Sequence, residues 1–452
     1  MKNAFWLTAR LAEPVVCFAW NGIEQLKHIE MLSTEARGAL CNLLRARLEW
    51  SANPIVTSTF RRKRASTARQ RSAKTINQGE ELLASYPGIC RLWTLYVDGW
   101  QRFVADFVTH SYPFSKTRKS GKRTRRSSIA AITPFLSDPH NGGRTVMKVR
   151  FADGSEWYYK PRSGCQEVQW FKLIRWINRE GFCLSFRAPE TVSARDHCWM
   201  QAVPSKRCRT KAQTERLYFR SGALAYLIFL LRGVDFHAAN LVVNGENPVF
   251  VDVETLLHPV TATPPEFQEQ EASILRTGLL PAIGCRDSHS GFTQLARHWH
   301  NARSGGVTSV PEPLVIGLLD GFNAMHAFLT AKRHRLRHLE RLVAELARSE
   351  GRIVYRPSEH YARALFQSFA PELMRTARDR RSFLLHFCER NWSSKRRVLE
   401  ECAALENGDI PVFRSSLRRI RLDLRPKIAS EARMLIKRHL GFTENFCSPP
   451  GA

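Results

Sequence analysis

The stretch Gly233-Val-Asp235-Phe-His237-Ala-Ala-Asn240, followed by the apolar run Asn247-Pro-Val-Phe-Val-Asp252-Val-Glu254, decides how this chain is interpreted. In kinase-type sites a loop aspartate meets the substrate hydroxyl. An asparagine five positions later holds magnesium, and an aspartate on the next strand holds a second metal contact. Asp235, Asn240 and Asp252 have this order and nearly this spacing. The stretch therefore predicts phosphoryl transfer.

Size and composition predict a globular protein. The chain has 452 residues, of which 43% are hydrophobic, which is enough for two or three domains. Its longest uncharged apolar run, Ser221 to Leu231, is too short to cross a membrane, and Arg10 and Glu13 interrupt the amino-terminal apolar segment. Eleven cysteines occur singly, without zinc-type spacing. We expect a soluble, cytoplasmic protein with reduced thiols, no transmembrane segment and no zinc site.

The net charge of +28 is unevenly distributed. Residues 61–74 and 116–126 each carry seven positive charges and no acid, so they predict two mobile basic loops. A solvated basic surface is the first interpretation, and an acidic peptide partner is the second. No zinc-finger, RNA-recognition or helix-turn-helix pattern supports nucleic-acid binding, and we expect none.

Hydrophobic periodicity predicts an α+β protein. Apolar residues recur at helical spacing in 1–50 and 80–110, and the segments 146–150 and 156–160 predict strands joined by a turn at Asp153-Gly154. An aromatic-rich helix follows from Glu167 to Asn178. A long helix from 213 leads to the Asp235 loop, and a hairpin of 241–243 and 249–253 turns at Asn244-Gly245. Helical periodicity is strong in 326–348 and 361–390.

This layout predicts a two-lobed, protein/lipid-kinase-like fold with extra helices in its carboxyl-terminal lobe. The predicted domains are a mainly helical region 1–127 with the two basic loops, an amino-terminal lobe 128–204, and a carboxyl-terminal lobe 205–452. The last of these carries the catalytic loop.

Each part of a phosphoryl-transfer site has a candidate. Lys160 ends a strand, from which a lysine reaches the inner phosphates, and Glu167 on the next helix is a candidate partner for it. Asn240 and Asp252 offer the oxygen ligands that magnesium prefers. There is no Walker motif and no kinase glycine loop. In their place the glycines of Ser137-Asp-Pro-His140-Asn-Gly-Gly-Arg144 allow the backbone to approach phosphate.

Several of these motifs, in this order, resemble the dehydratase domain of the type II lanthipeptide synthetases. They are Asp138-Pro-His140-Asn-Gly-Gly-Arg144, Tyr159-Lys160-Pro-Arg-Ser163, Asp235-Phe-His237-Ala-Ala-Asn240, Asp252-Val-Glu254-Thr-Leu256, Arg276-Thr-Gly-Leu-Leu-Pro281, Arg352-Ile-Val-Tyr-Arg356-Pro-Ser358 and Gly408-Asp-Ile-Pro411. The resemblance runs from about residue 80 to the carboxyl end.

The resemblance implies an enzyme that uses ATP and magnesium to phosphorylate Ser and Thr of a ribosomal precursor peptide. It then eliminates the phosphate, leaving dehydroalanine or dehydrobutyrine. By this resemblance the phosphorylation set is Lys160, Asp235, His237, Asn240 and Asp252, with Glu254 matching the motif in a less defined role. The elimination set is Arg352 and Ser358, where Ser358 replaces the family's threonine, together with Asp138 and His140.

The chain departs from the resemblance in length, because full synthetases continue into a zinc cyclase domain. We expect either a stand-alone dehydratase that works with a separate cyclase or a truncated remnant. The expected partner is a precursor peptide with an acidic leader, which a basic surface would attract. Two alternatives stay open. One is a small-molecule phosphotransferase of the aminoglycoside or choline kinase type, and the other is a non-catalytic peptide-binding remnant.

Overall fold

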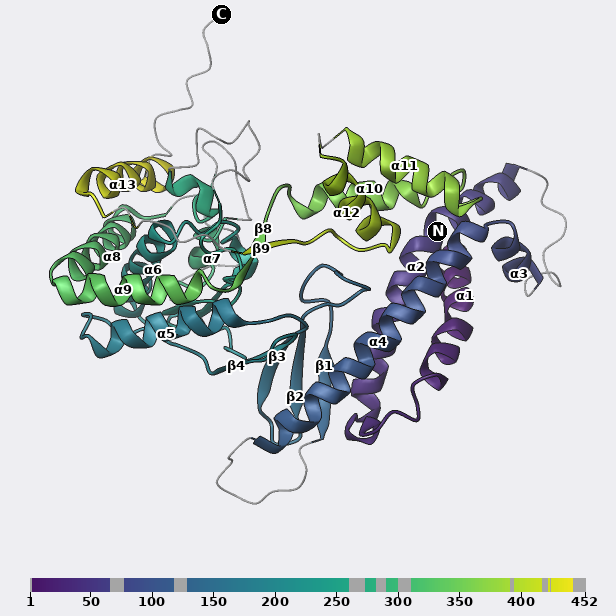
Figure 1. Ribbon diagram of the computed structural model, residues 1–452, viewed down its shortest axis with the longest axis horizontal. Helices are drawn as coiled ribbons and strands as arrows, with labels where there is room; N and C mark the ends of the chain where they lie inside the picture. Colours follow the sequence, from purple (N-terminus) through teal and green to yellow (C-terminus); the bar gives the residue numbers. More distant parts are fainter. Residues whose placement is uncertain are drawn as a thin grey trace, which may run out of the picture. The chain divides into compact units, whose positions relative to one another are not determined.

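The computed structural model describes residues 2–65, 77–117, 128–259, 273–281, 290–299, 310–390, 394–416, 422 and 424–441. The chain divides into two compact units, each built from two separate segments (Figure 1). The first unit comprises Met1–Arg162 and Arg356–Val412, and the second comprises Ser163–Tyr355 and Phe413–Ala452. The two units group the residues differently from the three predicted domains, whose boundaries stay a prediction.

Helices dominate the first unit. They are α1 (Lys2–Asn21), α2 (Thr34–Ala65), α3 (Asn77–Ala84), α4 (Pro87–Thr117), α10 (Ser358–Ser368), α11 (Ala377–Glu389) and α12 (Lys395–Glu406), with a short 3-10 turn η1 (Ile29–Met31). The apolar positions that predicted the helix over 80–110 are buried along α4, including Trp93, Trp100, Phe103 and Phe107. Burial of four large aromatic side chains on one stripe fixes this helix in the core of its unit.

The predicted strand pair of the first unit is confirmed. Strands β1 (Ile129–Thr133), β2 (Met147–Phe151) and β3 (Glu156–Lys160) form an antiparallel meander in which Val149 faces Trp157. The turn between β2 and β3 contains Gly154 with a φ of 80°. A positive φ is readily adopted only by glycine, which explains the Asp-Gly signal in the sequence.

The second unit mixes helices with short strand pairs. Its elements are α5 (Cys165–Arg179), β4 (Thr191–Ser193), β5 (Cys198–Gln201), α6 (Lys211–Leu230), η2 (Ala238–Asn240), β6 (Leu241–Asn244), β7 (Asn247–Phe250), η5 (Ile274–Thr277), α7 (Thr293–Ala296), α8 (Glu312–Thr330), α9 (Arg333–Leu346), β8 (Glu350–Ile353), β9 (Phe413–Ser416) and α13 (Pro426–Gly441). Strands β4 and β5, β6 and β7, and β8 and β9 pair antiparallel. The combination confirms the α+β class.

Helices α6 and α8 form the apolar centre of the second unit. A Cβ atom on Gly222 of α6 would collide with the backbone of Leu318, and one on Gly321 of α8 would collide with the backbone of Phe219. The two glycines therefore let the helix axes approach closely. Among the described residues, one helix, α8, is both long enough and apolar enough to cross a membrane. Helix α8 packs closely against α6, as the core helix of a folded unit does, and a soluble, cytoplasmic protein stays a prediction.

Two predicted boundaries are wrong, and two segments of helical periodicity are each divided between two helices. The periodic segment 326–348 contains a break at Ala331 and Lys332 between α8 and α9, and 361–390 is divided by residues 369–376 between α10 and α11. Strand β7 ends at Phe250, so the predicted strand 249–253 is too long. Helix α2 continues to Ala65 into the segment predicted as a basic loop, while 66–74 and 118–126 lie outside the described residues.

Candidate active site

Backbone geometry after α6 sets the position of Asp235. The loop contains Arg232 at a φ of 51° and Asp235 at a φ of 64°. The left-handed region disfavours side chains, although aspartate tolerates it better than most residues. Gly233 is required because a Cβ there would lie 2.5 Å from the ring of Phe236. The positive φ at a predicted catalytic residue is backbone strain of the kind that collects at functional sites.

Phe236 anchors this loop in the core. Its side chain is fully buried and meets Phe250 of β7 edge to face, with ring centroids 5.3 Å apart. Its N–H donates to the carbonyl of Thr277 at 2.8 Å, and Gly278 follows with a φ of 75° beside the Phe236 backbone. Sequence analysis assigned no role to the motif Arg276–Pro281. In the structure this segment packs against the backbone of the Asp235 loop and holds it in place.

Asp235, His237 and Asn240 converge within the second unit. The Asn240 Nδ2 donates to the Asp235 carbonyl at 2.8 Å, which closes the loop on itself. The His237 Nδ1 accepts from the N–H of Ala239 at 3.2 Å. Its Nε2 atom lies 3.6 Å from Asp235 Oδ1. His237 is thereby oriented by the backbone and faces the carboxylate.

Asp252 and Glu254 enter the site from the segment after β7. The N–H of Val251 donates to the carbonyl of Asn240 at 3.0 Å, so this segment is joined directly to the catalytic loop. The side chain of Gln166 in α5 is buried and is oriented with its amide nitrogen toward this segment. That nitrogen donates to the carbonyls of Val253 and Glu254, at 2.7 Å each. Asp252 is half-buried, and Glu254 is 7% exposed.

Glu254 joins two arginines. Its Oε1 accepts from Arg352 Nη1 at 3.1 Å, and its Oε2 accepts from Arg414 Nη2 at 2.9 Å. Arg352 also donates its backbone N–H to the Glu254 carbonyl at 2.9 Å. Arg352 of β8 and Arg414 of β9 are direct cross-strand partners. The strand pair therefore places two guanidinium groups on one carboxylate.

The carboxylates and arginines of this cluster shift one another's pKa. Burial raises the pKa of Asp235 above its ordinary value. The nearby His237 and the Arg352 guanidinium lower that pKa, and the carboxylates of Asp252 and Glu254 raise it again. For Arg352, burial alone would lower the pKa, but the acids around it outweigh burial and raise it. Arg352 is thus held charged at the predicted phosphoryl-transfer residue.

In the first unit, Asp409 holds the predicted glycine loop. Its buried carboxylate accepts from the N–H of Gly142 at 2.5 Å and of Gly143 at 3.0 Å, and it forms an ion pair with Arg47 of α2 at 2.8 Å. The suggestion that these two glycines offer their backbone to phosphate is therefore wrong, because Asp409 already accepts from their N–H groups. The Gly408–Pro411 motif has a structural use here.

His140 in the same loop is held by the chain next to Asp409. Its Nδ1 donates to the carbonyl of Ile410 at 2.7 Å, while the N–H of Ile410 donates to the carbonyl of Pro139 at 2.9 Å. Because Nδ1 carries the proton in this arrangement, the lone pair of a neutral imidazole lies on Nε2. Asp138 precedes this bridge and is half-buried.

The remaining predicted residues belong to separate elements. Lys160 ends β3 with 3% exposure, and Ser358 begins α10 with partial exposure, both in the first unit. Glu167 lies in the first turn of α5 in the second unit and has no exposed surface. A buried carboxylate requires a compensating partner. Its pairing with Lys160 stays a prediction.

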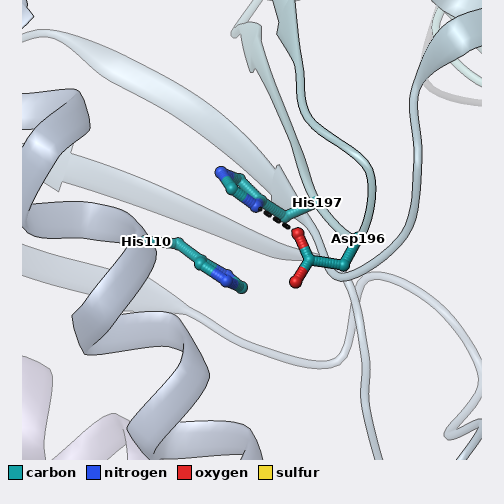
Figure 2. A group of neighbouring side chains, drawn as sticks. All are labelled: His110, Asp196 and His197. Carbon is teal, nitrogen blue, oxygen red and sulfur yellow. Dashed lines mark hydrogen bonds and ion pairs between the residues drawn. The ribbon is translucent and has the colours of Figure 1, made fainter.

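Figure 2 labels three further side chains: Asp196 and His197 belong to the second unit and His110 to the first. Asp196 and His197 lie on the turn between β4 and β5, and His197 Nδ1 is 2.9 Å from Asp196 Oδ1. His110 of α4 has its Nδ1 2.9 Å from the Tyr159 hydroxyl inside the first unit. Asp196 is two-thirds exposed, and exposed pairs of this kind contribute little to stability.

Comparison with known proteins places the chain in a family. The model of a domain of unknown function (DUF4135) matches residues 86–306 and 293–416. The chain belongs to this family. It is also similar to the lacticin 481/lactococcin biosynthesis protein LcnDR2 of Lactococcus lactis subsp. lactis, with 24% identity over 173 residues. That match covers 35% of this chain and 18% of the relative, so the chain corresponds to less than two thirds of that protein's length.

Sequence reasoning missed three residues of these sites: Arg414, Asp409 as an anchor, and its partner Arg47. Asp409 stands in a recognised motif, but its partners are hundreds of positions away. Arg414 follows that motif directly, three residues after Pro411. This proximity to a motif was the one available signal, and it does not identify a partner.

Proposed function

We propose that this chain is a lanthipeptide dehydratase, which phosphorylates Ser and Thr of a precursor peptide with ATP and then eliminates the phosphate. The observation that carries the proposal is that Arg352, assigned to elimination, shares one charged cluster with Asp235 and Asp252, assigned to phosphorylation. A simple kinase has no need for this arginine. The similarity to a lantibiotic biosynthesis protein supports the same assignment in its broader form, a role in lanthipeptide maturation.

In the first step, the substrate hydroxyl oxygen bonds to the γ-phosphorus of ATP, the bond from that phosphorus to ADP breaks, and the hydroxyl proton passes to Asp235. The raised pKa of Asp235 suits a group that must accept a proton near neutral pH. His237, set by the Ala239 N–H, orients the carboxylate. Lys160 is assigned to the ATP phosphates.

Magnesium suits the donor set of Asn240 and Asp252. Because the Asn240 Nδ2 is used by the Asp235 carbonyl, its amide oxygen is the atom that remains to coordinate a cation. Together with the half-buried Asp252 it offers one amide and one carboxylate oxygen, the type of set on which magnesium retains several waters. The ion would neutralise charge on the ATP phosphates.

In the second step, the Cα–H bond of the phosphorylated residue breaks and its electrons form the Cα–Cβ double bond. The Cβ–O bond breaks, and its electron pair leaves with the phosphate. We assign the proton to His140, beside Asp138, and stabilisation of the departing phosphate to Arg352. Ser358 offers the hydroxyl that threonine supplies in the family, on a side chain with more rotamer freedom.

The finer features of the proposal follow from the same resemblance. We assign a two-lobed kinase-like fold, a cytoplasmic location, a precursor peptide with an acidic leader, and a separate cyclase as the protein that uses the dehydrated product. The net charge of +28 supports capture of an acidic leader by electrostatic attraction.

The test is co-expression of the full chain with the Ser/Thr-rich peptide encoded beside it, followed by mass spectrometry of the peptide. The native chain should give dehydrated peptide, Arg352→Ala should accumulate phosphopeptide, and Asp235→Asn should leave the peptide unmodified. Arg216→Ala is the matched control, because Arg216 belongs to a similar ion pair with Glu246 in the same unit. Unchanged dehydration by Arg352→Ala would sink the elimination role. Phosphorylation of aminoglycosides or choline without peptide modification would indicate a small-molecule phosphotransferase.

A further inference from the structure

Arg414 is an arginine of the second unit for which neither sequence motif nor resemblance provides a role. It follows Phe413 at the start of β9 and lies directly opposite Arg352 of β8. Its Nη2 donates to Glu254 at 2.9 Å, and its side chain is 27% exposed. Arg414 thus has the same partner as Arg352 and more contact with solvent.

Two arginines in directly opposed positions of a strand pair repel each other. Glu254 offsets this repulsion, since its two oxygens each accept from a different guanidinium group. The carboxylate is nearly enclosed, at 9% side-chain exposure, whereas Arg352 and Arg414 keep 17% and 27%. The arrangement is therefore an anion held between two guanidinium groups whose outer parts reach water.

Each guanidinium has five N–H donors, and Glu254 accepts from one nitrogen of each. Donors therefore remain on both groups. Bidentate recognition of carboxylate and of phosphate uses the same planar fork, which lysine does not have. The bonds to Glu254 already hold both guanidinium groups, so less side-chain freedom is lost when an anion binds.

A similar triad in the same unit shows what a structural version looks like. Glu246 joins Arg216 and Arg220, at 2.5 and 3.2 Å. In that triad both arginines come from one helix, α6. Arg352, in contrast, interacts with Asp235 and Asp252. The triad at Glu254 is the one attached to the predicted phosphoryl-transfer loop.

We propose that Arg352 and Arg414 form a two-arginine site for a phosphate monoester, with Glu254 as the positioning residue that holds both guanidinium groups. The inference rests on the proposed function and deepens it, since the ligand would be the phosphorylated side chain before elimination and the free phosphate after it. Arg414 is then a second phosphate-contacting arginine.

The first experiment measures binding of inorganic phosphate to the full chain by isothermal titration calorimetry. Arg414→Ala should weaken phosphate binding about tenfold or more, the usual effect of losing a charge-assisted contact. Arg414→Lys, which keeps the charge without the fork, should restore part of the affinity. Arg216→Ala should bind phosphate as the native chain does, since it removes the same charge from the other triad. Phosphate binding that is absent in the native chain, or unchanged by Arg414→Ala, would overturn the proposal.

The second experiment separates this inference from the proposed function. With the precursor peptide, Arg414→Ala should raise the ratio of phosphopeptide to dehydrated peptide, while phosphorylation itself continues. Continued phosphorylation also shows that the variant is folded. If the native chain modifies the peptide and Arg414→Ala gives the same ratio, the two-arginine site is refuted and the dehydratase stands. If the native chain leaves the peptide unmodified, the proposed function fails, and the phosphate titration alone decides whether the site binds phosphate.

Discussion

Replacement of Asp409 by alanine provides a stringent test of the structure, because this carboxylate has three partners and almost no exposure. It is 1% exposed, accepts from the N–H groups of Gly142 and Gly143, and pairs with Arg47. Alanine would leave two backbone donors and one guanidinium without their acceptor. All of these partners lie in the first unit, so the expected effect is local to that unit.

The magnitude follows from the kind of pair that is broken. Removal of one partner from a buried ion pair costs about 3–5 kcal/mol, because the other charge remains buried. Arg47 keeps 14% of its side chain exposed and also donates to the Gly408 carbonyl at 3.0 Å, so part of its charge stays compensated. The expected loss in free energy of unfolding is therefore near the lower end, about 3 kcal/mol.

The assay is urea denaturation followed by tryptophan fluorescence, since Trp93 and Trp100 lie in the core of the same unit. Glu13→Ala is the matched control: it removes the ion pair of Glu13 with Arg45, which is partly exposed and should contribute less than about 1 kcal/mol. A double-mutant cycle of Asp409→Ala with Arg47→Ala should give a coupling energy of about 1–3 kcal/mol. A loss below about 1 kcal/mol for Asp409→Ala, equal to that of the control, would refute the buried-anchor reasoning.

Three further predictions concern the second unit and one matched turn. Gly278→Ala and Gly154→Ala both place a side chain at a positive φ, of 75° and 80°. Each should lower the free energy of unfolding by about 1–2 kcal/mol. Only Gly278→Ala should also slow peptide phosphorylation, since Gly278 lies against the backbone of the Asp235 loop. Burial lowers the pKa of His258 from 6.5 to about 4, so the unfolded chain binds the proton more readily. Stability should therefore fall by up to about 3 kcal/mol as pH drops from 6.5 to 4, a loss that His258→Gln should remove while keeping an acceptor for the Val354 N–H. The raised pKa of Asp235 means that its ionised form costs stability at neutral pH, a cost that fades as pH falls. Asp235→Asn should therefore be inactive yet melt at a higher temperature than the native chain at pH 7, and an unchanged or lower midpoint would contradict this account.

Local pattern was sufficient for elements whose signals are also local. Strand β3 has the predicted bounds, Glu156 to Lys160, because alternation and an Asp-Gly turn both lie within ten residues. The break between α8 and α9 has no such signal. Ala331 and Lys332 are ordinary helix formers, and the apolar periodicity continues through them. A turn fixed by packing of two helices in the folded unit leaves no trace in the sequence.

The residues of the candidate site show the same difference between local signals and features that depend on tertiary structure. The order of Asp235, Asn240 and Asp252 could be read directly, since loop and strand are close in sequence. The partners of Glu254 could not, because Arg352 and Arg414 are 98 and 160 positions away and meet it only through the pairing of β8 with β9. A sequence motif identifies the type of residue that a site requires, but the ion pairs of that residue depend on tertiary structure.

The charges of the cluster bear on how one site could serve two steps. The three carboxylates of Asp235, Asp252 and Glu254 and the two guanidinium groups of Arg352 and Arg414 leave a formal charge of −1. A magnesium ion on the acids would make this +1, which favours the phosphates of ATP. Glu254, the carboxylate that joins the two arginines, is separate from the proposed metal ligands Asn240 and Asp252. Phosphate installed on a substrate hydroxyl beside Asp235 would thus already lie near the cations that assist its departure, and loss of Arg414 should impair the second step more than the first.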